Sequence, residues 1–362
     1  MEIRKTHITD LAPTRDNRRN SEGDFILLNN GDVLFVYTRY DGGDGDGDPA
    51  DLYACVSHDG GDSFSPPRPL LLRKEIPADN VMSVTLRRMK NGDLGLFFLV
   101  KNPPHQCRLF FCRSKDEGQR FSAPAACIPH RGYFVVNNDR LLLTPSGRWL
   151  VPAAFTEVLV EDKTELARFG PAHCMLYASD DDGESWYLLS EIRPGGGMEH
   201  SATGLQEPGL ALLPGGVLWS FFRTDTGRQY ESFSFDDGKN WTAAQPSRFT
   251  SPASPLSVKR LRNGRLFAVW NPVPDYNGKN KNPHGIWTGG RTPLVCALSD
   301  ENGRDFCAPA AIETDPGCGY AYTAIFEAPN GGILLAYSAG GPADGGMLNR
   351  LRITKLRLQP EG

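Results

Sequence analysis

Short apolar segments separated by polar turns recur along the whole chain. Five of them have the length and residue types of β-strands, and each stops at a turn rich in serine, aspartate and glycine. These segments are DLYACV, RLFFCR, CMLYA, ESF and LVCAL. The pattern predicts a chain of short strands joined by tight turns, with few long helices.

The turns after these strands share the form S-x-D-x-G-x-x-[FW]. Serine and aspartate side chains accept hydrogen bonds from backbone N–H groups, glycine adopts a positive φ at little cost, and the aromatic residue anchors the turn on a core. In the last copy Glu301 replaces the aspartate. The five copies are SHDGGDSF at 57–64, SKDEGQRF at 114–121, SDDDGESW at 179–186, SFDDGKNW at 234–241 and SDENGRDF at 299–306.

A second kind of turn alternates with the first. Asn-Gly, Ser-Gly and Gly-Gly pairs each precede an apolar strand, as in tight hairpins. The six copies are NGDVLFVYTR, NGDLGLFFLV, SGRWLVPAAF, GGVLWSFFR, NGRLFAVW and GGILLAYS. Their mean period is about 60 residues, which fits one four-stranded unit. We predict an all-β fold, a six-bladed β-propeller with four-stranded antiparallel blades, as a single domain over residues 1–362. Two β-sandwiches are the alternative, but sandwiches would not repeat both turns in alternation.

The S-x-D-x-G-x-x-[FW] turn resembles the Asp-box, or BNR repeat, of the sialidase (neuraminidase) superfamily. With the interleaved hairpins, the resemblance covers residues 20–355. It implies an exo-acting glycoside hydrolase that releases a terminal sialic acid or a related acidic sugar by a retaining mechanism. It also implies that the turn aspartates are scaffold on the outer edges of the blades.

The resemblance implies a particular set of catalytic groups. Sialidases use a tyrosine nucleophile, a glutamate that activates it, an aspartic acid as proton donor, and arginines that hold the substrate carboxylate. Glu207 precedes the fourth hairpin and Arg223 ends it, while Arg291 lies in GGRTPLVCAL. Tyr322 and Tyr320 are the nucleophile candidates, and Tyr322 fits better because a threonine follows it.

The first arginine of the expected set has no direct equivalent. The Arg-Ile-Pro segment of the family falls near Ser21-Glu22, so either Arg18 or Arg19 serves this role, or Glu22 replaces the arginine. Arg39, at the end of VLFVYTR, is a further candidate. The remaining residues predicted to bind sugar hydroxyls are Asn138, Arg140 and Gln229.

The stretch DGGDGDGDPAD, at 41–51, holds several aspartates in a glycine-rich loop. An EF-hand loop starting at Asp44 would need glycine and glutamate where this chain has proline and cysteine. The resemblance instead implies that this loop carries the catalytic acid, with Asp46 preferred over Asp48 and Asp44. We expect the crowded carboxylates to raise one another's pKa.

Composition limits the remaining function classes. The formal net charge of −4 is too small to indicate nucleic acid or a membrane surface as partner. No apolar run reaches the length of about 18 residues that crosses a membrane. The N-terminus lacks the apolar core of a secretory signal, which favours a cytoplasmic location, or a secreted one if a leader precedes this sequence.

The eight cysteines form no C-x-x-C pair and have no histidine cluster beside them. We therefore expect no metal site and no cofactor, and we expect buried thiols, with disulfides as the alternative. The expected partner is a glycan or sugar acid. Two other functions remain open: a propeller glycosidase or lyase for a different acidic sugar, and a non-catalytic glycan-binding propeller.

Overall fold

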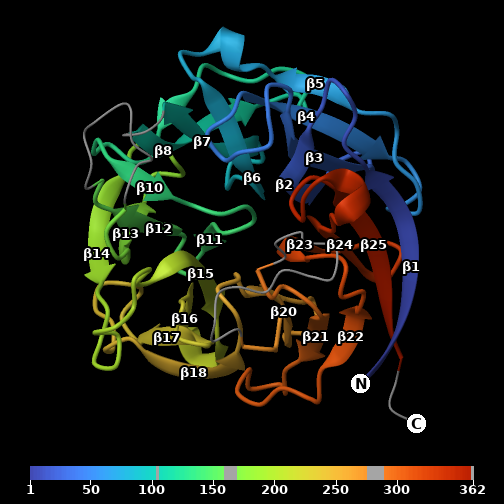
Figure 1. Cartoon of the computed structure of the whole chain (residues 1–362). Helices are drawn as coiled ribbons and strands as arrows, with labels where there is room; N and C mark the ends of the chain where they lie inside the picture. The colour runs from blue at the N-terminus through green and yellow to red at the C-terminus, as the bar shows by residue number, and fades with distance from the viewer. Residues whose placement is uncertain (103–105, 159–168, 275–288, 360–362) are drawn as a thin grey trace.

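The computed structural model describes residues 1–102, 106–158, 169–274 and 289–359. The fold is all-β, and its antiparallel groups of strands are arranged as a ring around a central axis (Figure 1). The described residues contain only three single-turn 3₁₀ helices, Arg73–Glu75, Pro214–Gly216 and Pro342–Asp344. Among these residues, no helix has the length and apolar character needed to cross a membrane.

Most groups contain four strands that follow one another in the chain. The first contains β2 (Arg19–Leu27), β3 (Val33–Tyr40), β4 (Ala50–Ser57) and β5 (Arg68–Leu71). The second contains β6 (Asn80–Arg88), β7 (Leu94–Asn102), β8 (Gln106–Ser114) and β9 (Ala125–Ala126). The third contains β10 (Tyr133–Val135), β11 (Leu142–Leu143), β12 (Trp149–Thr156), β13 (His173–Ser179) and β14 (Tyr187–Ile192).

The next two groups have the same order. One contains β15 (Gln206–Leu212), β16 (Leu218–Arg223), β17 (Arg228–Ser234) and β18 (Gln245–Thr250). The other contains β19 (Ser257–Arg260), β20 (Leu266–Trp270), β21 (Leu294–Leu298) and β22 (Ala310–Glu313). Short parallel contacts, Ala50 with Asn80 and Cys107 with Tyr133, connect the first three groups into one continuous sheet.

The two ends of the chain share the last group. It contains β23 (Ala321–Glu327), β24 (Ile333–Ser338) and β25 (Leu351–Gln359), with β1 (Glu2–Leu11) added antiparallel to β25. The N-terminal strand therefore lies beside the C-terminal one at the outside of the ring (Figure 1). This pairing joins the first segment of the chain to the last.

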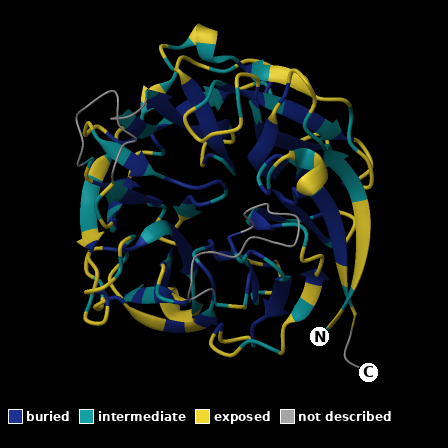
Figure 2. Ribbon diagram, viewed as in Figure 1, coloured by how far each residue is buried: buried dark blue, intermediate teal, exposed yellow. Residues whose placement is uncertain are grey.

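The middle strands are apolar on both faces. In β20 all five residues are buried, whereas β1 and β18 carry exposed residues. Neighbouring groups cover both faces of a middle strand, while an outermost strand contacts solvent. Figure 2 shows this distribution, with buried residues inside the ring and exposed ones along its rim.

The repeated turns have one hydrogen-bond pattern in four copies. The serine Oγ donates to the aspartate Oδ1 over 2.7 to 2.9 Å, and the glycine N–H donates to the serine Oγ over 2.7 to 3.0 Å. In the last copy Asp300 accepts from the N–H groups of Arg304 at 2.8 Å and Asp305 at 3.2 Å. A carboxylate one position earlier thus replaces the missing aspartate of that copy.

All eight cysteines are free thiols, and six of them are buried. The prediction of buried thiols is confirmed for those six, whereas Cys307 and Cys318 are partly exposed.

Candidate active site

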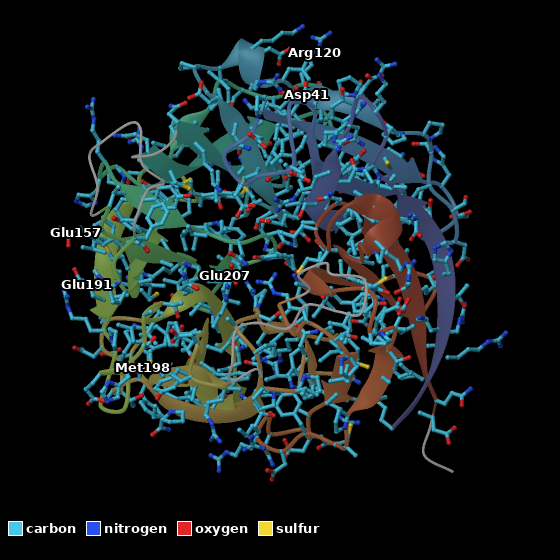
Figure 3. All side chains as sticks on the ribbon, viewed as in Figure 1. Asp41, Arg120, Glu157, Glu191, Met198 and Glu207 are labelled. Atoms are coloured by element: carbon cyan, nitrogen blue, oxygen red, sulfur yellow. The ribbon has the colours of Figure 1, made fainter. Side chains whose placement is uncertain are left out.

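A pocket of about 330 Å³ receives side chains from the innermost strands of several groups. Figure 3 shows Glu207 on the inner side of the ring, whereas Asp41, Arg120, Glu157 and Glu191 lie at its periphery. The acidic, basic and phenolic residues that line this pocket are Glu22, Asp46, Lys101, Tyr133, Glu207, Arg223, Arg291 and Tyr322.

Tyr322, Glu207 and Arg223 form a hydrogen-bonded unit on one wall of the pocket. The Tyr322 hydroxyl donates to Glu207 Oε1 over 3.2 Å, and Arg223 Nη1 donates to the same oxygen over 2.7 Å. Glu207 is the second residue of β15 and Arg223 ends β16, and the antiparallel register pairs Arg223 with Gln206, the residue before Glu207. A carboxylate in this position is able to accept the phenolic proton of Tyr322.

Arg291 completes this wall. Its guanidinium carbon lies 5.3 Å from the centre of the Tyr322 ring, and its Nη2 donates to the carbonyl of Ala253 over 3.1 Å. Burial, and then the nearby charge of Glu207, raises the pKa of Tyr322 to about 12, although Arg291 and Arg223 act in the opposite direction. The tyrosine is therefore neutral at physiological pH and needs a base before it acts as a nucleophile.

Glu22 lies in β2, which is in contact with β23, the strand that carries Tyr322. It is 4% exposed, its Oε2 accepts a hydrogen bond from the Ser83 hydroxyl, and its Oε1 is 3.5 Å from Arg19 Nη2. Arg19 is 1% exposed and does not line the pocket. We expected Arg19 to contact the substrate directly. Instead it is buried beside the pocket wall and pairs with Glu22 and Asp46, because a buried charge is stable only when an opposite charge lies beside it.

Asp46 is the member of the acidic loop that lines the pocket. Its Oδ1 is 2.7 Å from Arg19 Nη1, and its carbonyl oxygen accepts a hydrogen bond from Lys101 Nζ over 3.1 Å. The expectation that crowded carboxylates raise the pKa is wrong for Asp46. Partial desolvation raises this pKa, but Arg19 and Lys101 outweigh it and hold the pKa well below its usual range.

Four residues that line the pocket share an uncommon backbone conformation. The φ angles are +49° at Glu22, +57° at Ser83, +46° at Glu207 and +59° at Tyr322. Each lies on the innermost strand of its group, where the pairing register with the next strand shifts. A bulge of this kind redirects a side chain, which explains how four separate strands deliver these groups to one pocket.

The other aspartates of the acidic loop, and the second tyrosine, lie outside the pocket lining. Asp48 accepts a hydrogen bond from the Gly45 N–H within the loop, and Asp44 accepts one from Asn349. Tyr320 is 1% exposed in the apolar core, with its ring 6.3 Å from that of Tyr337. Tyr320 and Tyr322 are both in one short segment, but the bulge at Tyr322 separates their surroundings.

The remaining residues predicted to bind substrate also lie outside the lining. Asn138 donates to the carbonyls of Gly23 and Tyr322, and so holds two groups together. Arg140 and Gln229 are buried and donate to the carbonyls of Leu256 and Ser254, respectively.

Two arginines predicted near the first strand also differ from expectation. Arg39 packs over the ring of Tyr53 with its guanidinium 4.5 Å from the ring centre, and Arg18 is exposed. Neither residue lines the pocket.

Some lining residues were absent from the prediction, above all Lys101 and Gln206. Lys101 lies near the end of β7, as Arg39 does in β3 and Arg223 does in β16. A basic residue near the end of the second strand, shared by these three groups, was the signal that would have found it. Gln206 directly precedes Glu207, and the other polar lining residues are Ser83, Asn137 and Thr156.

The described residues contain no group of three or more histidine, cysteine or acidic side chains arranged to hold a metal ion. The pocket instead combines three cationic and three acidic side chains with a tyrosine in contact with a carboxylate. Such an arrangement suits binding of an anionic, hydroxyl-rich ligand and proton transfer beside it.

Solved structures of similar fold include several sialidases. A protein of unknown function from Dyadobacter fermentans is 18% identical, with a TM-score of 0.74 and coverage of 99% of both chains. The NanB sialidase of Streptococcus pneumoniae is 13% identical, with a TM-score of 0.70 over 98% of this chain and 70% of that one. The intramolecular trans-sialidase of Ruminococcus gnavus is 14% identical, with a TM-score of 0.67 and coverage of 98% of both chains.

At these identities the structural similarity establishes a sialidase-like fold and nothing finer. No curated protein is a detectable match to the sequence. Residues 56–335, most of the chain, match the family model described as a BNR repeat-like domain. The chain therefore belongs to the BNR repeat-like domain family, within the sialidase/BNR-repeat superfamily.

Proposed function

We propose that this protein is an exo-acting, retaining glycoside hydrolase that releases a terminal sialic acid or a related acidic sugar. The observation that carries the proposal is the Tyr322 hydroxyl 3.2 Å from Glu207 Oε1, inside a pocket that Arg223 and Arg291 also line. The raised pKa keeps Tyr322 neutral at physiological pH, and Glu207 Oε1 lies where it is able to accept the phenolic proton.

In this proposal Tyr322 attacks the anomeric carbon while its proton passes to Glu207. Arg223 donates to Glu207 Oε1 and so fixes the base toward the tyrosine. Arg223 and Arg291 also offer the planar N–H pairs that suit a sugar carboxylate. A tyrosine is neutral before attack, so a substrate carboxylate does not repel it as it would repel a carboxylate nucleophile.

We also propose the finer description of the fold. The antiparallel groups correspond to the six blades of a β-propeller in one domain, and the repeated turns correspond to Asp-box turns. The two kinds of turn in alternation, and the addition of β1 to the last group, support this count.

The substrate need not be sialic acid itself. Arg19 pairs with Asp46 and Glu22 rather than lining the pocket, so the cations that line it among the described residues are Arg223, Arg291 and Lys101. This difference favours a related acidic sugar over sialic acid, with a lyase or a non-catalytic glycan-binding protein as the outcomes that the next experiment distinguishes.

The test uses fluorogenic glycosides of sialic acid, a uronic acid and a deoxyulosonic acid with the wild-type protein and its variants. We expect release from one of them, and a loss of at least about 10²-fold in kcat for both Tyr322→Phe and Glu207→Gln. Tyr320→Phe is the matched control, since it changes a tyrosine two residues away that lies in the core.

Product analysis separates the alternatives. Unsaturated sugar products indicate a lyase, and binding without turnover indicates a glycan-binding protein. Wild-type rates in Tyr322→Phe would contradict the nucleophile assignment directly.

A further inference from the structure

Glu22 and Asp46 are two carboxylates of the same pocket with opposite surroundings. Glu22 is part of β2, with its side chain 5% exposed, whereas Asp46 is on a loop, with its side chain 62% exposed. Both face Arg19, but Asp46 is 2.7 Å from one guanidinium nitrogen and Glu22 is 3.5 Å from the other. The arginine therefore pairs closely with Asp46 and only loosely with Glu22.

The backbone at Glu22 matches the backbone at the proposed nucleophile and base. Glu22, Glu207 and Tyr322 all have φ between +46° and +59° at a register shift on an innermost strand. A non-glycine residue in this region is strained, and strain of this kind clusters at functional sites. Asp46 has no positive φ, so its backbone lacks this feature.

The charges around the two carboxylates push their protonation in opposite directions. Burial raises the pKa of Glu22, and the charge of Asp46 raises it further, while Arg19 and Lys101 oppose this rise. The pKa of Asp46 is held well below its usual range, chiefly because Arg19 and Lys101 outweigh its partial desolvation. Two acids whose pKa values are shifted in opposite directions are typical of sites in which one member donates a proton and the other stays ionised.

We propose that Glu22, rather than Asp46, is the catalytic acid and base of this pocket. The proposal rests on the proposed function. In the first step Tyr322 Oη bonds to the anomeric carbon and gives its proton to Glu207. The bond from that carbon to the leaving oxygen breaks, and Glu22 protonates the leaving oxygen.

In the second step a water molecule gives a proton to ionised Glu22 and its oxygen bonds to the anomeric carbon. The bond to Tyr322 breaks, and Tyr322 recovers its proton from Glu207. Both carboxyl groups return to their starting states, so the sum is hydrolysis with retention.

Asp46 then has a positioning role that it exerts through Arg19. By pairing with Nη1 of Arg19, it limits how strongly that guanidinium stabilises ionised Glu22. Ser83 orients the Glu22 carboxyl, since its hydroxyl donates to Oε2, but this hydrogen bond opposes the effect of Asp46 because it lowers the pKa of Glu22. Glu22, Ser83 and Asp46 all line the pocket.

The first experiment compares Glu22→Gln with Asp46→Asn on two substrates that share the sugar but differ in the leaving group. With an alkyl glycoside, whose leaving oxygen needs a proton, we expect Glu22→Gln to lose at least about 10²-fold in kcat. With an aryl glycoside that leaves without protonation, we expect a much smaller loss in kcat/KM, while kcat stays low because the second step still lacks its base. Sodium azide should restore turnover of Glu22→Gln on the aryl glycoside and give the glycosyl azide, because azide needs no base.

The second experiment follows kcat/KM against pH. The basic limb of the wild-type profile reports deprotonation of the acid, so we expect it to disappear in Glu22→Gln. In Asp46→Asn, and in Ser83→Ala as a milder variant, the limb should persist. It should move to lower pH in Asp46→Asn, since a freed Arg19 favours ionised Glu22.

Leaving-group dependence and azide rescue in Asp46→Asn but not in Glu22→Gln would overturn the assignment. If Glu22→Gln does not fold, as judged by circular dichroism, Asp46→Asn decides the question. A basic limb that persists there and moves to lower pH supports Glu22 as the acid, and a limb that disappears there overturns the assignment. Loss of activity in Tyr322→Phe with full activity in Glu22→Gln contradicts this inference alone. Absence of turnover by the wild-type protein contradicts the proposed function and this inference together.

Discussion

At the scale of single residues, pairing decides what each charged group of the pocket is able to do. Arg19 was a candidate for holding the substrate carboxylate, yet it is buried against Asp46 and Glu22. Arg223 and Arg291 line the pocket, but Arg223 also contacts Glu207 and Arg291 covers the Tyr322 ring. A planar guanidinium with several N–H groups is able to contact its protein neighbour and still present N–H donors to the pocket, which a lysine cannot do.

This gives a residue-scale prediction for Arg291→Lys. The charge near Tyr322 is kept but the planar N–H pair is lost, so binding of the carboxylate weakens in the ground state and the transition state alike. We expect KM for the acidic substrate to rise about 10- to 100-fold with a smaller change in kcat. Steady-state kinetics measure both values, and Arg248→Lys, on an exposed arginine away from the pocket, is the control. An unchanged KM would argue against a role for Arg291 in binding.

At the scale of elements, the repeated turn is a scaffold that stays separate from the chemistry. In the copy at 179–186, Asp181 accepts hydrogen bonds from the Ser179 hydroxyl at 2.8 Å and the Ser185 N–H at 2.9 Å. The last copy keeps a carboxylate cap through Asp300, although its aspartate is displaced by one position. The turn is therefore capped by a carboxylate in either position, as long as that carboxylate accepts hydrogen bonds from the backbone N–H groups of the turn.

We predict that Asp181→Ala lowers the free energy of unfolding by about 1–2 kcal/mol, because the turn loses its internal hydrogen bonds. Activity at low temperature should stay within about 2-fold of wild type, since Asp181 does not line the pocket. Urea unfolding and a turnover assay on the same preparation measure the two effects. The control is Glu301→Ala, which removes an acid that Asp300 has replaced, and a large loss of stability there would contradict this account of the turns.

At the scale of the whole molecule, contacts between distant parts of the chain close the ring. Asp10 in β1 accepts hydrogen bonds from Arg350 Nη1 and Arg352 Nε, each over 2.9 Å. Farther along the ring, Arg87 links Asp24 and Asp139, and Lys259 contacts Asp139 as well. Arg87 and Asp139 are 52 residues apart in the chain, and Asp10 and Arg352 are 342 residues apart.

The contact of Asp10 with Arg350 and Arg352 predicts a pH effect on stability. Partial burial raises the pKa of Asp10, but Arg352, His7 and Arg350 outweigh this and lower it to about 2. A carboxyl with a lowered folded-state pKa stabilises the fold above its ordinary pKa near 4, and that contribution is lost as the pH falls from 4 to 2. We expect Asp10→Asn to lower the unfolding free energy by about 1–2 kcal/mol at pH 7, after allowing for solvent screening.

The difference between wild type and Asp10→Asn should disappear near pH 2. Thermal unfolding of both proteins at pH 7, 4 and 2 measures it. A difference that stays constant with pH would mean that packing rather than charge explains the loss.

The sequence by itself determined the strands and the turns, because each depends on local pattern, whereas Glu207 and Arg223 were predicted from the resemblance to sialidases. Strand composition and turn chemistry act over a few residues, and a hairpin brings Glu207 and Arg223 together without help from the rest of the chain. The tertiary structure alone decided which side chains face the pocket. The bulges at Glu22 and Tyr322 turn two side chains inward, and Arg19 and Lys101 set the charge of Asp46 from other strands. Such effects depend on contacts between residues far apart in the chain, and no local pattern contains them.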